Sequence, residues 1–451
     1  MNKSVYESYS QEKLNKSQEF CEGYKAFITN AKTEREAVVE TIKIVEKAGF
    51  KNINSFKKLK PGDKIYSVNM NKAILLATIG NEPFENGINI VGSHIDSPRL
   101  DLKPFPVYED EISKLCLFDT HYYGGIKKYQ WTATPLALHG VVCKKDGTTI
   151  NLCLGEDEND PVLGVSDLLP HLDKETRKEV VTGEELNLLV GLIPNKKAKE
   201  NKVKSNIINL LKEKGIDEED LFSSEIEIVP AGKARDFGLD RSMVIGYGQD
   251  DKVCAYPSII ALLNAKNAKK TCVCLLVDKE EIGSVGATGM ESLFFENTVA
   301  EIMELSGKYS NIALRKCLSN SKMLSSDVTA AYDPNRPEPF NQTTEAFLGN
   351  GIAFCKYTGS KGKSGASDAN PEYIASLRKI LDENKISFQA TEMGKVEAGG
   401  GGTIAYIMAK YNMDVIDAGV PVLSMHAPWE ITSKVDIYET YRAYLAFYEN
   451  M

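Results

Sequence analysis

The sequence has 451 residues, of which 42% are hydrophobic and 26% charged, so the chain is long enough for two globular domains with buried cores. Its formal net charge is −9, and no basic tract stands out, which argues against a nucleic-acid partner. The N-terminal segment lacks the apolar core of a signal peptide, and no stretch approaches the roughly 20 apolar residues of a membrane span. We therefore expect a cytoplasmic protein without a membrane partner. The nine scattered cysteines are expected to be reduced core residues.

The N-terminal part is expected to begin with two helices and to continue with strands. The residues that would share one face of the first helix are Phe20, Tyr24, Phe27 and Ile28. Thr33 and Glu36 have the spacing of a capping box and predict the start of the second helix. Three runs rich in β-branched residues then predict strands over 64–70, 72–80 and 87–94.

The character of the chain changes over residues 105–240, which we interpret as an inserted second domain. Residues 136–155 alternate around Asp146-Gly147 and predict a β-hairpin. Residues 196–220 are strongly charged, and we interpret them as a mobile, solvated segment. The flanking residues 1–104 and 241–451 are then expected to form one domain.

The C-terminal part predicts alternating helices and strands. A helix is expected over 253–265, an apolar strand over 271–278, a later strand over 419–426 and a helix at the end of the chain. Such alternation is typical of an α/β sheet with helices on both faces.

Polar residues that directly follow predicted strands are the candidate site. In open α/β sheets, ligands bind outside the carboxyl ends of the strands, so polar residues placed there are candidates for binding or catalysis. Four segments satisfy this rule, namely His94-Ile95-Asp96, Asp250-Asp251, Glu280-Glu281 and His426.

His94 and Asp96 are two residues apart, which places both side chains on one face while the strand continues. A metal-bound imidazole needs its other ring nitrogen held, and the carboxylate of Asp96 could do this. Taken alone, a histidine after a strand is more often a packed or exposed residue.

Glu280 and Glu281 follow a largely apolar run. Burial of two adjacent carboxylates is unfavourable by several kcal/mol unless a cation or strong donors compensate, and a metal ion is the simple remedy. One carboxylate could bind the ion while the other serves as general base. The alternative for this segment alone is a solvated loop.

Asp250 precedes a predicted helix, and a carboxylate can bridge two divalent ions about 3.5 to 4 Å apart. Asp327 and His426 would complete a set of two histidines and three carboxylates. This mixture suits two ions of Zn²⁺, with Co²⁺ or Mn²⁺ as substitutes.

The segments VGSHIDSPRLDLKP, DKEEIGSVGATG, MLSSDVTAAYDP and GVPVLSMHAPWE resemble the motif series of the aspartyl aminopeptidase family of zinc metallopeptidases. The resemblance implies that His94 and Asp327 hold one metal, that Glu281 and His426 hold the other, and that Asp250 bridges them. It implies further that Glu280 is the general base and that Asp96 orients His94. Asp251 remains a rival for the bridge, because many relatives have Asp-Asn where this chain has Asp-Asp.

The resemblance also implies a phosphorylase/hydrolase-like catalytic domain, an inserted β-rich dimerisation domain and a tetrahedral dodecamer acting on peptides. His171 resembles a histidine that reaches the substrate from a neighbouring subunit, and Lys356 lies where a pocket lysine is expected. Histidines that relatives carry after the Asp327 motif are absent here, so a preference for N-terminal Asp or Glu stays open.

The expected function is therefore removal of single N-terminal residues from peptides. A carboxypeptidase or amidohydrolase on the same two-metal scaffold is one alternative, and a non-catalytic oligomeric shell protein is another. A serine hydrolase is poorly supported, since the sequence has no GxSxG motif.

Overall fold

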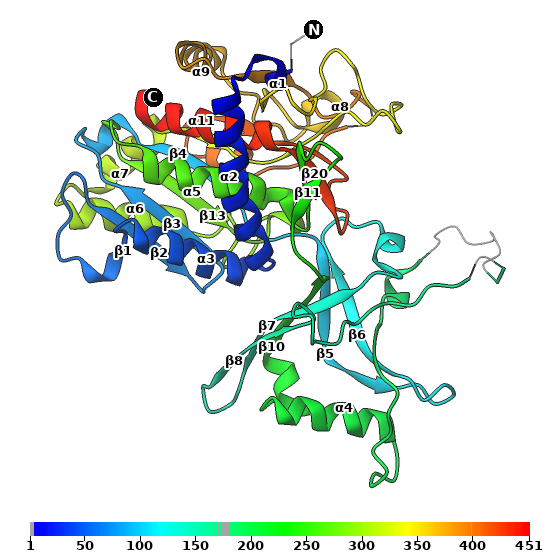
Figure 1. The fold of residues 1–451 in the computed structure, drawn as a ribbon. Helices are drawn as coiled ribbons and strands as arrows, with labels where there is room; N and C mark the ends of the chain where they lie inside the picture. The colour runs from blue at the N-terminus through cyan, green and yellow to red at the C-terminus, as the bar shows by residue number, and fades with distance from the viewer. Residues whose placement is uncertain (1–3, 170, 173–180, 398) are drawn as a thin grey trace. The chain divides into compact units, whose positions relative to one another are not determined.

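The computed structural model describes residues 4–169, 171–172, 181–397 and 399–451 (Figure 1). The chain divides into two compact units. The first comprises the residues up to Ser97, Ala234–Met425 and Glu430–Met451, and the second comprises Pro98–Lys233 and His426–Trp429.

A mixed sheet forms the centre of the first unit. In spatial order, its strands among the described residues are β1 (Lys51–Asn52), β2 (Lys64–Asn69), β3 (Ala73–Thr78), β13 (Cys272–Val277), β4 (Asn89–His94), β14 (Lys322–Ser325), β18 (Asp414–Gly419), β16 (Ile352–Cys355) and β17 (Phe388–Thr391). The central strands β13, β4, β14 and β18 run parallel to one another. Their carboxyl ends therefore meet at one edge of the sheet.

Helices bury both faces of this sheet. One core packs against α2 (Gln11–Asn30), α3 (Glu34–Lys47), α5 (Gln249–Asn264), α9 (Pro371–Glu383) and α11 (Lys434–Asn450). The other packs against α6 (Phe294–Leu305), α7 (Asn311–Asn320) and α10 (Ala405–Ala409). Strand β13 shows why both faces are covered, because its side chains alternate between two cores. Cys272, Cys274 and Leu276 enter the first core. The alternate residues Val273, Leu275 and Val277 enter the second.

The expected N-terminal elements are confirmed. Tyr24, Phe27 and Ile28 are buried on α2. The side chain of Thr33 accepts a hydrogen bond from the backbone N–H of Glu36 at 3.2 Å, and Glu36 accepts one from the backbone of Thr33, so α3 begins with a capping box. The three predicted strands appear as β2, β3 and β4.

A smaller sheet of the first unit corrects one prediction. It orders β11 (Arg235–Phe237), β12 (Met243–Gly246), β20 (Glu430–Ser433), β19 (Pro421–Leu423) and β15 (Thr329–Ala330). The expected strand over 419–426 is wrong, since β18 ends at Gly419 in the large sheet and β19 begins at Pro421 in this one. A Cβ on Gly419 would lie 1.9 Å from the carbonyl oxygen of Asp327, so only glycine fits this close approach.

The second unit contains an antiparallel sheet. Its order is β8 (Thr149–Leu154), β7 (Leu136–Cys143), β10 (Ser224–Pro230), β5 (Arg99–Glu109), β6 (Cys116–Tyr123) and β9 (Leu188–Gly191). Strands β7 and β8 form the hairpin expected around Asp146-Gly147. The charged segment over 196–220 was expected to be mobile, but it contains α4 (Lys202–Glu213), because apolar residues at helical spacing bury one of its faces.

The fold is thus a mixed α/β fold with several sheets, as expected. The remaining short elements are α1 (Val5–Ser8), α8 (Ser360–Lys363), η1 (Ile53–Ser55), η2 (Phe84–Asn86), η3 (Lys128–Trp131), η4 (Gly183–Glu185), η5 (Glu218–Ser223) and η6 (Glu280–Ile282). Two cysteines depart from the expected burial, because Cys143 and Cys153 are exposed in the hairpin. Within the described ranges, no helix is both long and apolar enough to cross a membrane.

Candidate metal centre

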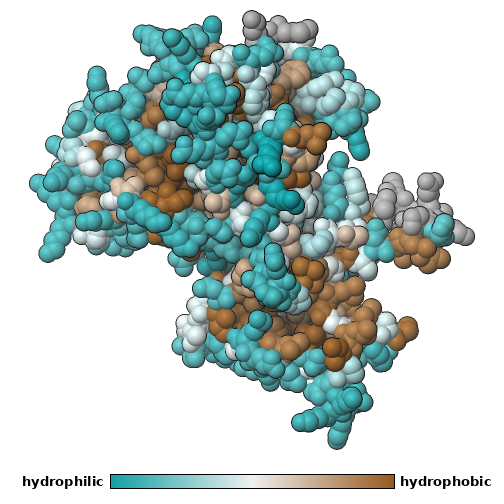
Figure 2. Space-filling model, in the orientation of Figure 1, coloured by the Kyte–Doolittle hydropathy of each residue, from teal (hydrophilic) through white to brown (hydrophobic). Residues whose placement is uncertain are grey.

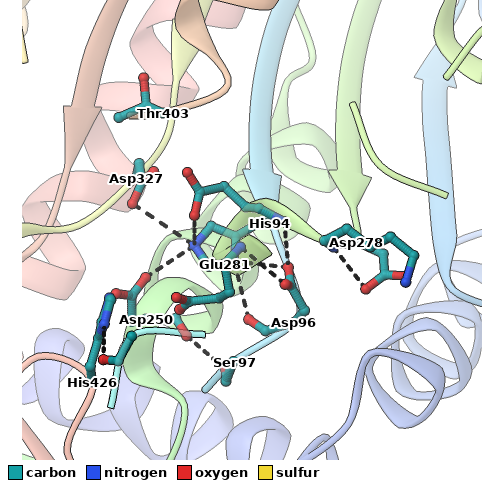
Figure 3. Close-up of polar contacts among 12 residues, drawn as sticks. His94, Asp96, Ser97, Asp250, Asp278, Glu281, Asp327, Thr403 and His426 are labelled. Carbon is teal, nitrogen blue, oxygen red and sulfur yellow. Dashed lines mark hydrogen bonds and ion pairs between the residues drawn. The ribbon is translucent and has the colours of Figure 1, made fainter. Parts of the chain in front are cut away.

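Three neighbouring parallel strands deliver polar side chains to one edge of the large sheet. His94 is the last residue of β4 and pairs with Val277, the last residue of β13. Glu280 and Glu281 follow β13 after one turn of loop, and Asp327 follows β14 by two residues. These residues therefore lie near one edge of the sheet, and Figure 3 shows Glu281 and Asp327 beside His94.

The imidazole of His94 is held from both sides. Its Nδ1 lies 3.2 Å from Oδ1 of Asp96 and 3.1 Å from the Asp96 carbonyl oxygen, while its Nε2 lies 3.0 Å from Oδ1 of Asp250. Burial opposes the charged ring, but the hydrogen bonds to Asp250 and Asp96 outweigh burial and hold the pKa of His94 well above its usual value. A proton on Nδ1, directed at Asp96, leaves Nε2 for a metal ion.

Asp96 also fixes the loop that carries the two glutamates. Its Oδ1 accepts a hydrogen bond from the backbone N–H of Glu280, and its Oδ2 accepts one from that of Glu281, both at 3.2 Å. The carboxylate of Glu280 reaches within 3.9 Å of His94 Nε2. Asp96, which is fully buried, therefore orients both the histidine and the glutamate loop.

Asp250 and Asp251 open α5 with non-helical backbone angles. Asp251 is fully buried, and neither of its carboxylate oxygens has a nitrogen or oxygen partner for a hydrogen bond among the described residues. Burial raises the pKa of Asp251 well above its usual range, and the neighbouring carboxylate of Asp250 adds to this. The structure thus places both rivals for the bridge beside the centre, with Asp250 in contact with His94.

His94, Asp250 and Asp327 form a group that could hold a metal ion. Each offers one ligand atom, and these atoms lie within 4.8 Å of one another. Burial, followed by the repulsion from the carboxylates of Glu280 and Asp251, raises the pKa of Asp327. A divalent cation would offset this clustered negative charge, and one imidazole with carboxylate oxygens is a donor set that zinc accepts. The residues present therefore fit a zinc centre.

Three further predicted residues, His426, His171 and Lys356, come from other segments of the chain. His426 belongs to the short segment assigned to the second unit, where its Nδ1 lies 2.8 Å from the carbonyl oxygen of Gly125. His171 is exposed in the two-residue stretch described between undescribed neighbours. Lys356 follows β16, which runs antiparallel to β18, so the chain at Lys356 leads away from the edge at which β4, β13 and β14 end. Its Nζ lies 4.0 Å from Asp368.

Three buried residues near Asp250 were not predicted from the sequence. Ser97 and Glu430 contact the backbone of Asp250, and Lys252 contacts Ser97. Ser97 and Lys252 are chain neighbours of Asp96 and Asp251, and Glu430 follows His426 by four residues. That proximity was the available signal, but the pattern did not indicate which backbone group each side chain would bind.

The fold and this group of donor atoms are those of a candidate metal-dependent enzyme built on an α/β sheet. A model of the aminopeptidase I zinc metalloprotease family, M18, matches residues 27–448. A probable M18 family aminopeptidase 1 of Clostridium acetobutylicum is 57% identical over 458 residues, which cover 99% of this chain and 98% of that protein. The chain therefore belongs to the M18 family of zinc aminopeptidases.

Solved structures agree with this assignment. The crystal structure of an M18 family aminopeptidase from Thermotoga maritima is similar with a TM-score of 0.96 at 42% identity, covering 100% of both chains. A structure of the S. cerevisiae mApe1 dodecamer is similar with a TM-score of 0.78, covering 96% of this chain and 97% of that one. At 20% identity, the yeast structure shares the fold alone.

Proposed function

We propose that this zinc aminopeptidase holds two divalent ions per subunit and removes single N-terminal residues from peptides, with Glu280 as general base. The observation that carries the proposal is the convergence of the ligand atoms of His94, Asp250 and Asp327 on one buried point, with the Glu280 carboxylate beside it. Zn²⁺ is the proposed ion, and Co²⁺ or Mn²⁺ are substitutes.

The proposed roles divide the site residues into two ligand pairs. His94 and Asp327 would hold one ion, Glu281 and His426 would hold the other, and Asp250 would be shared by both. The hydrogen bond between His426 Nδ1 and the Gly125 carbonyl supports this role, because it favours the tautomer whose proton is on Nδ1 and not on Nε2. Asp96 acts as a positioning residue through its contacts with His94 and the glutamate loop.

When bound, the two ions supply Lewis acidity, which polarises the first peptide carbonyl and acidifies a water molecule. A carboxylate oxygen of Glu280 takes the proton from that water and later delivers it to the leaving amine. Asp96 keeps Glu280 in place during both transfers, since it holds the loop backbone at Glu280 N and Glu281 N.

A screen of peptide substrates tests the proposal and its specificity. The zinc-loaded enzyme should cleave peptides with a free N-terminus and leave N-acetylated peptides intact, and chelation should abolish this activity. Cleavage of N-blocked peptides from the C-terminus would favour the carboxypeptidase alternative. No turnover of any substrate by the metal-loaded protein would favour the shell protein.

Within the same screen, we expect a preference for N-terminal Asp or Glu over Leu or Ala. A pocket of about 240 Å³ in the first unit has three lysines and one glutamate in its lining, namely Lys361, Lys363, Lys395 and Glu392, which favours an anion. Lys356, which does not line this pocket, and His171 are the substrate contacts that the family resemblance implies, and Lys356→Met should then lower kcat/KM for aspartyl substrates about tenfold. Lys379→Met, an exposed lysine of α9 paired with Glu383, is the matched control. Faster cleavage of leucyl than of aspartyl substrates would contradict the preference.

We propose further that the first unit is a phosphorylase/hydrolase-like catalytic domain and that residues 105–240 are an inserted dimerisation domain. Hydrophobic residues gather on the surface of the second unit (Figure 2). The exposed hydrophobic residues of this unit include the stacked pair Phe105 and Phe222, and apolar side chains line a groove of about 400 Å³ beside α4. Surfaces of this kind mark protein interfaces. A tetrahedral dodecamer in the cytoplasm is the proposed assembly.

Mixing of subunits tests whether His171 acts across the dimer interface. Glu280→Gln and His171→Ala subunits, each impaired, are dissociated, combined and reassembled. Activity should rise above that of either parent, because mixed dimers pair an intact catalytic centre with an intact histidine from the partner. Activity at the average of the parents would show that His171 acts within its own chain. A monomer in light scattering of the intact protein would contradict the assembly itself.

A further inference from the structure

Both backbone polar groups of Asp250 are held by side chains from other parts of the first unit. The backbone N–H of Asp250 donates to Oε2 of Glu430 at 3.1 Å. Its carbonyl oxygen accepts from the hydroxyl of Ser97 at 2.7 Å. Because Asp250 has non-helical angles at the start of α5, its N–H lies among those that no helical carbonyl satisfies.

The Ser97 hydroxyl is itself oriented by a buried lysine. Nζ of Lys252 donates to Oγ of Ser97 at 2.6 Å, and both side chains are buried. A hydroxyl that accepts from an ammonium group turns its own proton toward another acceptor, which here is the Asp250 carbonyl. Gly248 leaves room for this chain of hydrogen bonds, since a Cβ there would lie 2.8 Å from Ser97 Oγ and 2.9 Å from Lys252 Nζ.

Glu430 is anchored independently of that chain. It lies in β20 opposite Gly246 of β12, and its carbonyl oxygen accepts from Nε2 of Gln249 at 2.6 Å. Gln249 in turn accepts from the hydroxyl of Tyr24 on α2 at 3.0 Å. The position of Asp250 is thus set by contacts that reach α2, β20 and the segment that follows β4.

We propose that Ser97, Lys252 and Glu430 are positioning residues that fix Asp250 for metal binding and thereby set the metal affinity of the centre. This inference rests on the proposed role of Asp250 as a ligand. Without the Ser97 hydroxyl, the Asp250 carbonyl loses its partner and the Lys252 ammonium loses an acceptor, so the carboxylate of Asp250 is free to shift. Outer partners of metal ligands typically change metal affinity by about 10–100-fold when removed.

The test measures zinc affinity of the metal-free full-length protein by competition with a chelator, and the absorption spectrum of the Co²⁺-loaded protein. Ser97→Ala should weaken zinc binding at least about tenfold and alter the Co²⁺ spectrum. Ser97→Thr, which keeps the hydroxyl, should restore most of the affinity. Ser258→Ala is the matched control, because Ser258 is a buried serine of α5, the helix that carries Asp250, and its hydroxyl donates to Ala255 O at 2.7 Å.

The outcomes separate this inference from the function on which it rests. A Ser97→Ala protein that melts earlier but binds zinc as the wild type does would overturn the inference, since Ser97 would then serve the fold alone. Ser97→Cys, of similar shape but weak hydrogen bonding, provides the measurement if Ser97→Ala does not fold, and failure of both to fold would likewise overturn it. Unchanged affinity in Asp250→Ala would instead refute the proposed ligand role.

Discussion

Glu280→Gln is expected to lower kcat by at least about 10²-fold, the scale of the loss of a general base, while the metal content stays unchanged. The amide keeps the shape of the side chain and its place beside His94, but it cannot accept a proton at neutral pH. The backbone hydrogen bond from residue 280 to Asp96 does not involve the side chain, so the loop should keep its conformation. The effect should therefore appear in turnover and not in metal binding.

The adjacent carboxylate provides the matched control. Glu281→Gln changes the same functional group one residue away, yet it should lower metal occupancy, because Glu281 is the proposed ligand. Single-turnover kinetics with an aminoacyl substrate and metal analysis of both proteins decide between the roles. Loss of a metal equivalent in Glu280→Gln, or full occupancy in Glu281→Gln, would mean that the two roles are exchanged.

Much of the centre could be predicted because strand ends can be read from a sequence. Apolar runs of strand length predicted β4 and β13, and parallel strands bring their carboxyl ends to one edge of the sheet. His94 at the end of the first run and Glu280 after the second were therefore expected to lie close together, whereas Asp327 was proposed to complete the ligand set. Hydrophobic periodicity also placed the buried face of α2 correctly.

The sequence was less informative where tertiary contacts decide the conformation. The run over 419–426 looks continuous, but the close approach of Gly419 to the Asp327 carbonyl ends one strand and the next joins another sheet. In α4 the many charged residues obscure the helical spacing of the apolar residues Val203, Ile207 and Ile208, which are buried. The contact between Glu430 and Asp250 joins residues 180 positions apart, and no local pattern encodes it.

The affinity of the centre for zinc is expected to rise about tenfold per pH unit for each proton that the metal displaces. In the metal-free protein, the hydrogen bonds to Asp250 and Asp96, acting against burial, keep the pKa of His94 well above its usual value. Below that raised pKa the ring carries a proton that must leave before Nε2 can bind an ion. Asp327 adds to this competition, since burial and neighbouring carboxylates raise its pKa too.

The same pKa shifts determine whether the metal-free fold becomes more or less stable as the pH rises. The raised pKa of His94 contributes stability below its unfolded value of about 6.5, and this contribution is lost as the pH rises through the folded pKa. The raised pKa of Asp327 adds a penalty that grows as the pH rises above about 3.9. Both effects weaken the metal-free fold at high pH, where zinc binds best. Zinc should therefore raise the melting temperature more at pH 8 than at pH 5.5. The added stability should scale roughly with the logarithm of the zinc affinity.

Competition titrations and melting curves at several pH values measure both quantities. His94→Asn should lower the slope of the logarithm of affinity against pH by about one, because one displaced proton is removed. Asp436→Asn is the control, since burial raises the pKa of Asp436 to about 7 while its carboxylate accepts hydrogen bonds from Gly349 N and Gly351 N, and Asp436 is not among the proposed ligands. That variant should change how unfolding depends on pH and leave the slope of zinc affinity unaltered. A wild-type affinity independent of pH would show that His94 is already neutral in the metal-free centre, and the contacts of its ring with Asp250 and Asp96 would then need another explanation.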